Sequence, residues 1–479
     1  MDNYRFEEDL LGKRKVPNDV YYGIQTLRAM ENFQITGYKM DKEFIKALGI
    51  VKKAAAKANM VTGLLDKKRA QAIMDAAQEV IDGKLNDEFV LDPIQGGAGT
   101  STNMNANEVI ANRAIELYGE GHRGDSSVIS SLTHVNMSQS TNDVIPSAIK
   151  IALLLKSGAL LKSTEKLESA FRTKAKEFDH ILKMGRTQLQ DAVPIRLGQE
   201  FLAHANASKR SRERMAQAME SLKTINMGAT AIGTSLNADP EYIRLVEDYL
   251  RDISGFDLKI AEDLVDATQN TDAYIEVSSA IKAWATVISK ICNDLRLMGS
   301  GPRSGLHEIN LPEVQPGSSI MPGKVNPVIP EAVNQVAFQI IGNDVTINIA
   351  AEAGQLELNV MEPVLAFNLM QSFDIMTNAQ NMLVEKCIVG ITANEERCKE
   401  FVERSIGVVT ALNPHIGYEK SCMVAKEALE ERKSIREVVL AHKLLDEEEL
   451  NKILDPYEMT KSGIAGKELL KNVNQKIKI

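Results

Sequence analysis

The sequence predicts a mainly α-helical protein built around a bundle of long helices, and two observations carry this prediction. Between Val277 and Met298 apolar residues recur at alternating spacings of four and three. This is the seam of a helix that packs lengthwise against other helices. From Val144 to Phe178 one face stays apolar for most of the run, despite Gly158. Long amphipathic helices of this kind pack side by side in a bundle.

Helical patterns on either side of these two extend the bundle. They occupy residues 331–351 and 357–389, and another runs from beyond Pro194 to about Asn226, so the middle of the chain holds about five long helices. The first hundred or so residues are mixed, and the last eighty-odd return to short helices. We therefore expect three domains, an N-terminal mostly helical one (1–141), the central bundle (142–395) and a small C-terminal helical one (396–479).

Composition excludes several classes of protein. The 479 residues are 44% hydrophobic and 25% charged, as in an ordinary soluble protein with a large core. A net charge of -9 provides no basic footprint for nucleic acid, so any site for an anion must be built locally. The first residues lack the pattern of a signal peptide, and no apolar run approaches the length of a membrane span. We expect a cytoplasmic protein that binds neither nucleic acid nor membrane.

The cysteines do not indicate a metal site. Only four occur in the chain and none has CxxC spacing, at positions Cys292, Cys387, Cys398 and Cys422. Free buried thiols are therefore expected in place of disulfides or a zinc site.

Two polar loops precede helices in the first part of the chain. In residues 95–108 three glycines are followed by Thr100, Ser101 and further polar residues, and a helix-like run begins at Glu108. Hydroxyls and free N–H groups at a helix start can bind a carboxylate, or can cap the helix with no ligand. In residues 134–143 Ser140, Thr141, Asn142 and Asp143 are all capping types before a long helix.

Two further loops carry candidate ligand groups. Residues 183–194 are expected to end one helix at a glycine and to begin another beyond a proline, with Thr187 and Gln188 as the polar groups. Residues 317–326, GSSIMPGKVN, place two hydroxyls, Lys324 and Asn326 on a segment broken by glycines and a proline. Such a segment is either an ordinary connecting loop or a site. Many neutral donors with one cation suit a small dicarboxylate.

Together these segments resemble the aspartase/fumarase superfamily over essentially the whole chain. The motifs are GTSTNMNANE, SQSTND, GRTQLQDAVP and GSSIMPGKVNP. Within the superfamily the chain is more similar to the aspartases. Fumarases of this type typically have QSSND, GRTHTQDA and NFELNVFKP where this sequence has SQSTND, GRTQLQDA and QLELNVMEP.

The resemblance implies a fold and a reaction. The fold would have three domains, with a central five-helix bundle that forms a twenty-helix core in a homotetramer and active sites composed of loops from three subunits. The reaction would be the reversible deamination of L-aspartate to fumarate and ammonia, by abstraction of a Cβ proton through an aci-carboxylate intermediate. No cofactor or metal would be required, and the sequence does not decide whether a divalent ion activates the enzyme.

The resemblance also implies a role for each site residue. Ser318 would be the general base. Thr187, Lys324 and Asn326 would hold the α-carboxylate. The β-carboxylate would be held by Thr100, Ser140, Thr141 and Ser319, and the amino group by Asn142 with Thr100 and Thr141.

Two positions depart from the usual pattern of the family. Gln188, where many relatives have His, is interpreted as a polar contact beside the substrate-binding groups. Ser235 replaces a usual glycine, and it would be strained if its φ is positive. The alternative functions are a fumarase or another lyase of the superfamily, and a helical scaffold without catalysis. The presence of Ser318, Lys324 and Asn326 together argues against the scaffold.

Overall fold

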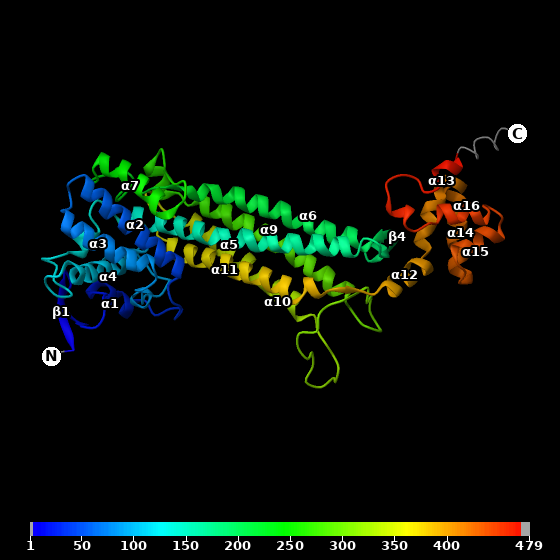
Figure 1. Ribbon diagram of the computed structural model, residues 1–479, viewed down its shortest axis with the longest axis horizontal. Coiled ribbons are helices and arrows are strands. Elements are labelled where there is room, and N and C mark those ends of the chain that lie inside the picture. Colours follow the sequence, from blue (N-terminus) through cyan, green and yellow to red (C-terminus); the bar gives the residue numbers. More distant parts are fainter. Residues whose placement is uncertain (1–2, 471–479) are drawn as a thin grey trace. The chain divides into compact units, whose positions relative to one another are not determined.

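The computed structural model describes residues 3–470 and confirms a mainly helical fold (Figure 1). The chain divides into two compact units. Unit 1 comprises residues up to 163 together with 211–286 and 336–378, and unit 2 comprises 164–210, 287–335 and residues from 379 onwards. The boundary falls within five long helices, α5 (Thr141–Glu177), α6 (Leu197–Met219), α9 (Asp272–Met298), α10 (Val328–Glu352) and α11 (Glu362–Lys386).

The seam predicted for α9 is buried as expected. Its seven apolar residues are each at most 6% exposed, namely Val277, Ile281, Trp284, Ile288, Ile291, Leu295 and Met298. Full burial of such a side chain stabilises the fold by about 1.5 to 3 kcal/mol. The alternating spacing is therefore the main reason why this segment is held as a packed helix.

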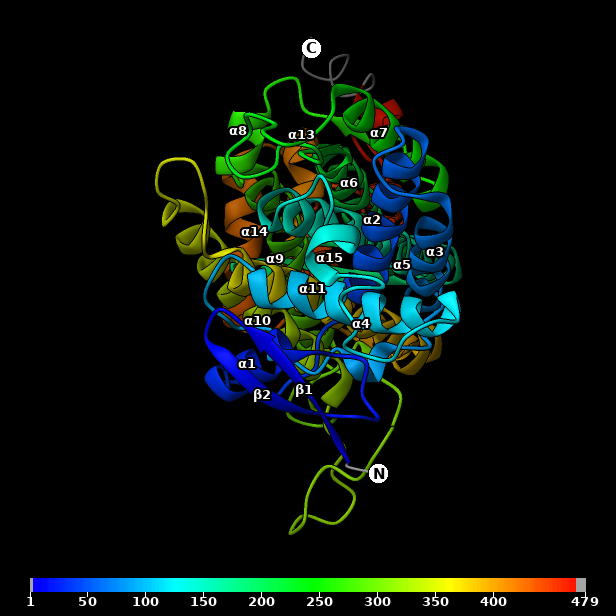
Figure 2. The same cartoon turned by 90° about the vertical axis from the view of Figure 1, so that its left-hand side faces the viewer.

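Unit 1 holds the N-terminal elements. A hairpin of β1 (Tyr4–Asp9) and β2 (Gly12–Pro17) precedes the helices α1 (Ile24–Asn32), α2 (Lys42–Val61), α3 (Lys67–Ile81) and α4 (Thr100–Tyr118). Figures 1 and 2 show α2 between α3 and α7 (Pro240–Ser254), and α4 packs on α3. The short strands β5 (Thr224–Ile225) and β6 (Lys259–Ile260) pair in parallel, and α8 (Leu264–Gln269) follows them.

Unit 2 holds two small sheets and the C-terminal helices. The sheets are β3 (Leu182–Thr187) with β4 (Gln190–Arg196) and β7 (Ile309–Asn310) with β8 (Thr392–Ala393), both antiparallel. The helices are α12 (Glu395–Arg404), α13 (Asn413–Ile416), α14 (Tyr418–Glu431), α15 (Ile435–Ala441) and α16 (Glu447–Ile453). Helices α13 to α16, orange to red in Figure 1, enclose a core of their own around Val424, Val438 and Leu450.

Helix α4 begins earlier than the sequence predicted. It starts at Thr100, so most of the expected 95–108 loop is helical. The asparagines at 103, 105 and 107 are all buried, and this hides the usual contrast between an apolar and a polar face. Helix α11, in turn, begins at Glu362 and not at Glu357.

The segment 183–194 was predicted wrongly. It does not join two helix ends directly, because α5 already ends at Glu177 and the segment forms most of the β3–β4 hairpin. Gly185 lies where β3 passes β4, and a Cβ there would come within 2.7 Å of the carbonyl oxygen of Val193. Helix α6 ends at Met219, short of the expected Asn226.

Two expectations from composition need correction. Helix α5 contains one window with a mean hydropathy of 1.7, long and apolar enough by composition to cross a membrane, although 67% of that window is buried within the protein. A buried core helix passes the same test. Of the four free cysteines, three are buried as predicted and Cys422 is exposed.

Candidate active site

The first turn of α4 carries Thr100 in unit 1. Gly97 and Gly99 have φ values of 88° and 86°, which only glycine adopts readily. A Cβ on Gly99 would lie 3.0 Å from the side chain of Ile145, so the glycine lets the start of α4 pack directly on the first turn of α5. Thr100 begins the helix, and its Oγ1 donates to the carbonyl of Gly97 at 2.7 Å.

The start of α5 carries Ser140, Thr141 and Asn142. It is fixed by Asp143, whose buried carboxylate accepts N–H bonds from Ser140 at 2.9 Å, Gly228 at 3.1 Å and Thr230 at 3.0 Å. Burial raises the pKa of Asp143 to about 6, although these three N–H groups act in the opposite direction. Residues 136–142, which comprise a loop and the first two residues of α5, are called the 136–142 loop below. Asp143 ties this loop to the loop that follows β5.

The four candidate residues of unit 1 lie at two helix starts that contact each other. Asn103, one turn beyond Thr100, donates to Thr141 Oγ1 at 3.3 Å. Asn142 Nδ2 donates to the carbonyl of Ala231 at 2.7 Å. The structure therefore brings together hydroxyls, an amide and the N-termini of two helices, which are groups that favour a carboxylate.

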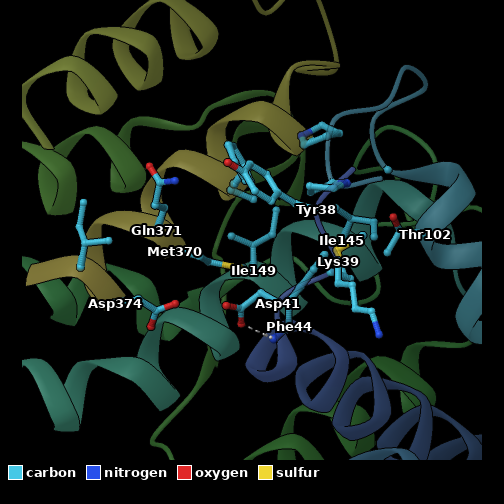
Figure 3. Close-up of a pocket in the computed structure, with 17 residues that line it drawn as sticks. Tyr38, Lys39, Asp41, Phe44, Thr102, Ile145, Ile149, Met370, Gln371 and Asp374 are labelled. Carbon is cyan, nitrogen blue, oxygen red and sulfur yellow. Dashed lines mark hydrogen bonds between the residues drawn. The ribbon is translucent and has the colours of Figure 1, made fainter. Parts of the chain in front are cut away.

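Two cavities lie near these helix starts, and neither suits a dicarboxylate. The cavity in Figure 3 has a volume of about 410 Å³ and is lined mainly by apolar groups such as Ile145, Ile149 and Met370, with Thr102 at its edge. The other, of about 820 Å³, is lined by Glu7, Glu8 and other carboxylates. Neither contains any of the substrate-binding side chains proposed from the sequence.

In unit 2, Thr187 ends β3 beside a tight turn. Gln188 and Leu189 form this two-residue turn with φ values of 55° and 59°, and positive φ is strained for residues other than glycine. A buried charge cluster supports the hairpin. Glu308, fully buried, accepts a hydrogen bond from Arg186 at 2.7 Å, and its other oxygen forms an ion pair with Lys183 at 2.8 Å.

The segment 317–326 closes on itself between β7 and α10. Gly317 donates its N–H to the carbonyl of Lys324 at 2.7 Å, and Asn326 Nδ2 donates to the carbonyl of Gly317 at 2.7 Å. A Cβ on Gly317 would come within 2.7 Å of the Lys324 carbonyl oxygen. Glycine is therefore required here for a close approach of two backbones. Asn326 braces this neck through its amide N–H group.

Ser318 is partly buried, directly follows the neck at Gly317 and lies in a distinctive turn. Its Oγ accepts N–H bonds from Ile320 at 3.2 Å and from Met321 at 2.9 Å. Two N–H donors on one hydroxyl oxygen stabilise its deprotonated form, so the Ser318 oxyanion forms more readily in this turn than that of a free serine. Ser319 follows it, and Lys324 has no acceptor within hydrogen-bonding distance among residues 3–470.

Two further features bear on the site. Ser235 has a φ of 58°. This position therefore requires a positive φ, and the strain predicted from the sequence is present. Among residues 3–470 no group of His, Cys, Asp and Glu is arranged to hold a metal ion.

Sequence reasoning missed the buried polar groups beneath the 136–142 loop. Lys52 and Asn103 lie there, and both are almost fully buried. The one signal available was the position of Lys52 in the helical stretch GIVKKAAAKAN, four residues after Leu48 and four before Ala56, on one face with these apolar residues.

Comparison with known proteins identifies sequence relatives over nearly the full chain. The family described as Lyase matches residues 12–342, and the family described as Fumarase C C-terminus matches residues 408–461. The aspartate ammonia-lyase of a Bacillus species is 61% identical over 97% of this chain and 99% of the relative. That of Escherichia coli (strain K12) is 52% identical over 94% of this chain and 95% of the relative.

Solved structures share the fold. A fumarate lyase:delta crystallin from Brucella melitensis, solved with cobalt, has a TM-score of 0.93 and 48% identity over 96% of this chain and 100% of that chain. A class II fumarase from Schistosoma mansoni has a TM-score of 0.92, with 34% identity over 95% of this chain and 99% of that chain.

Proposed function

The chain belongs to the lyase family of the aspartase/fumarase superfamily, and on this basis we propose that it catalyses the reversible deamination of L-aspartate to fumarate and ammonia. The Ser318 turn is the structural observation that carries the proposal, because it provides a base on an exposed loop that also bears Lys324. Identities of 52% to 61% with aspartate ammonia-lyases, against 34% with the class II fumarase, favour aspartate over malate.

The reaction begins with removal of a Cβ proton by Ser318. This proton is weakly acidic because it lies beside a carboxylate, and its removal leaves a doubly charged aci-carboxylate. Preorganised hydrogen bonds must stabilise that charge, and loss of one such donor in a water-excluded site typically costs about 3 kcal/mol. Thr100, Ser140 and Thr141 of unit 1, together with Ser319, supply these donors to the β-carboxylate.

The other end of the substrate is held by charge and by polar groups. Lys324 and Asn326, with Thr187, bind the α-carboxylate, and Gln188 supports this contact from the adjacent turn. The amino group is bound by Asn142 with Thr100 and Thr141. Ammonia leaves without the strong acid that hydroxide would need, which agrees with the neutral side chains of Thr100, Thr141 and Asn142. No step requires a cofactor or a metal ion.

The assembly proposed is a homotetramer in which loops of three subunits complete each site. The support in this chain is an apolar stripe on α10, where Phe338, Val345 and Ile349 are 61%, 54% and 63% exposed. Their spacings of seven and four place them on one helix face. An apolar face of this kind suits burial against another copy of the bundle. We place the enzyme in the cytoplasm, with a small dicarboxylate as its ligand.

The function is tested by following fumarate absorbance with aspartate and with malate as separate substrates. Aspartate should be converted and malate should not. Ser318→Ala should lower kcat by about 10²- to 10⁴-fold, the usual contribution of a general base. It should leave assembly unchanged because Ser318 lies on a loop outside the buried core. Ser304→Ala, at an exposed loop serine of unit 2, is the control and should behave as wild type.

Two results would contradict the proposal. Conversion of malate in preference to aspartate would make the chain a fumarase. Retention of more than about a hundredth of the activity by Ser318→Ala would place the base on another residue.

A further inference from the structure

Beneath the 136–142 loop lies a lysine whose charge is not balanced by any carboxylate in contact with it. Lys52, on α2, is 0% exposed. Its Nζ donates to Asn136 Oδ1 at 3.1 Å and to Gln139 Oε1 at 2.9 Å. Both acceptors are neutral amides, and an ammonium has three N–H donors. A buried charge without a counter-ion is costly, so its presence here requires an explanation.

Comparison with the other buried lysines shows that a buried lysine without a carboxylate partner is unusual in this protein. Among residues 3–470 three more lysines are buried, and Lys174 and Lys183 each have a carboxylate within 3.0 Å. Lys150 is the only other one without such an ion pair, and it donates to the carbonyl of Thr224 at 2.7 Å. The acceptor of Lys150 lies on β5, which carries none of the candidate site residues, whereas the two acceptors of Lys52 belong to the loop that leads into them.

A short chain of amides connects Lys52 with a substrate-binding hydroxyl. Asn136 Oδ1 accepts from Lys52, from Asn103 Nδ2 at 3.3 Å and from Asn107 Nδ2 at 3.1 Å. Asn103 Nδ2 also donates to Thr141 Oγ1 at 3.3 Å. Two amide side chains therefore separate the ammonium from Thr141. The Oδ1 atoms of Asn103 and Asn107 are buried and accept no hydrogen bond from the described residues.

We propose that Lys52 is a positioning residue of the active site, whose buried positive charge acts through Asn136 and Asn103 to favour the second negative charge that develops on the β-carboxylate held by Thr141. The inference rests on the proposed function, because it needs an intermediate with that charge. A low local dielectric transmits a charge over a few side chains far better than water does. Lys52 itself does not touch the substrate.

The electrostatics of the free protein agree with this role. Burial lowers the pKa of Lys52 to about 7, and Asp143 is the charged group that acts against this lowering. A further negative charge near Thr141 would raise the pKa of Lys52 and favour its ammonium form. The ammonium and the intermediate therefore stabilise each other, which is what selective stabilisation of a transition state requires.

The test compares ways of removing the charge while keeping a polar group. Lys52→Gln removes it directly. Asn136→Asp leaves Lys52 in place but pairs it with a carboxylate, in a nearly isosteric change. Each should lower kcat for aspartate by about 10-fold or more. The affinity for succinate, which carries only the ground-state charge, should fall by a smaller factor. Lys52→Arg keeps the charge and should recover part of kcat.

A second measurement separates electrostatics from damage to the loop. With aspartate deuterated at C3, the isotope effect on kcat should increase in Lys52→Gln, because the step that creates the second charge has become slower. Lys150→Met is the matched control, since it also removes a buried ammonium that lacks an ion pair. It should leave the isotope effect and the succinate affinity as in wild type.

Several outcomes would overturn the inference while leaving the proposed function intact. These are wild-type kcat in Lys52→Gln or Asn136→Asp, equal losses of kcat and succinate affinity, or the same kinetic changes in Lys150→Met. A wild-type protein that does not deaminate aspartate would instead refute the function itself. If Lys52→Gln fails to fold, Asn136→Asp and Lys52→Arg still decide the question, because both retain a cation at this position.

Discussion

Ser318 and Lys324 lie on the same closed segment, residues 317–326, but of these two side chains only that of Ser318 forms hydrogen bonds with it. Ser318 Oγ is engaged by the N–H groups of Ile320 and Met321, whereas the ammonium of Lys324 has no acceptor among residues 3–470. The backbone alone therefore assists the base, and the lysine remains available for a carboxylate. This division agrees with the two roles proposed for the residues.

Substitution of Lys324 should mainly affect substrate binding. Lys324→Met removes the only cation of the 317–326 segment, and a charge-assisted hydrogen bond is worth about 1.5 to 3 kcal/mol. We expect kcat/KM for aspartate to fall by roughly 10- to 100-fold, with a clear rise in KM. Steady-state kinetics measure both constants. Lys426→Met, at an exposed lysine of α14, is the control, and an unchanged KM in Lys324→Met would refute the contact with the α-carboxylate.

Single residues also show where sequence reasoning reaches its limit. Ser235 stands where relatives usually have glycine, and this alone suggested backbone strain. The φ of Ser235, 58°, confirms the positive-φ conformation. Lys52 could not be recognised in the same way, because a lysine beside an apolar face is normally solvated. Its burial depends on Asn136 and Gln139, which are more than eighty residues away in the sequence. Such contacts are not encoded in any local pattern.

At the scale of elements, the first turn of α11 contains a buried carboxyl with an unusual pKa. Glu362 is 2% exposed, and burial raises its pKa to about 8, although Lys150 acts in the opposite direction. In the folded protein the group thus holds its proton up to about pH 8, while in the unfolded chain it loses the proton near its ordinary pKa. Between these values the folded state binds more protons, so stability falls as pH rises.

Glu362→Gln should remove this dependence. Relative to the variant, the wild type should lose roughly 2.5 kcal/mol of unfolding free energy between pH 6 and pH 9. Lys150, whose pKa burial lowers while Glu362 acts against this lowering, contributes an opposite slope. The difference between the two proteins therefore reports on Glu362 together with its effect on Lys150. Urea unfolding at fixed protein concentration, followed by fluorescence of the buried Trp284, measures the unfolding free energy of both proteins at each pH. Parallel pH profiles would show that Glu362 is ionised in the folded state.

The elements differ in how far the sequence determines them. The α9 seam was predictable because its periodicity reflects burial on one side only. The start of α4 was not predictable, because its asparagines are buried and form hydrogen bonds with other segments. The β3–β4 hairpin was missed because its turn, Gln188-Leu189, lacks the Asn-Gly or Gly residues that normally signal one. Local signals fail where tertiary contacts or function require a strained conformation.

For the whole molecule, the division of the site residues is the main constraint. Thr100, Ser140, Thr141 and Asn142 belong to unit 1, whereas Thr187, Ser318, Ser319, Lys324 and Asn326 belong to unit 2. Unit 1 contributes neutral donors, and unit 2 contributes the base and the cation. Neither set alone suffices for the proposed reaction. The family resemblance, and not the sequence pattern, suggested that different subunits bring the two sets together.

This composite arrangement can be tested by complementation. Chains with Ser318→Ala and chains with Asn142→Ala, each inactive alone, should regain activity when co-expressed. If the two residues of a site come from different subunits, random mixing in a tetramer leaves about a quarter of the sites with both groups intact.

A mixture of Ser318→Ala and Lys324→Met chains is the matched control. It should show no recovery, because these two residues lie on one loop of one chain. Differently tagged subunits verify that mixed tetramers form. Mixed tetramers of the Ser318→Ala and Asn142→Ala chains with no activity above the single variants would place both groups in the same chain.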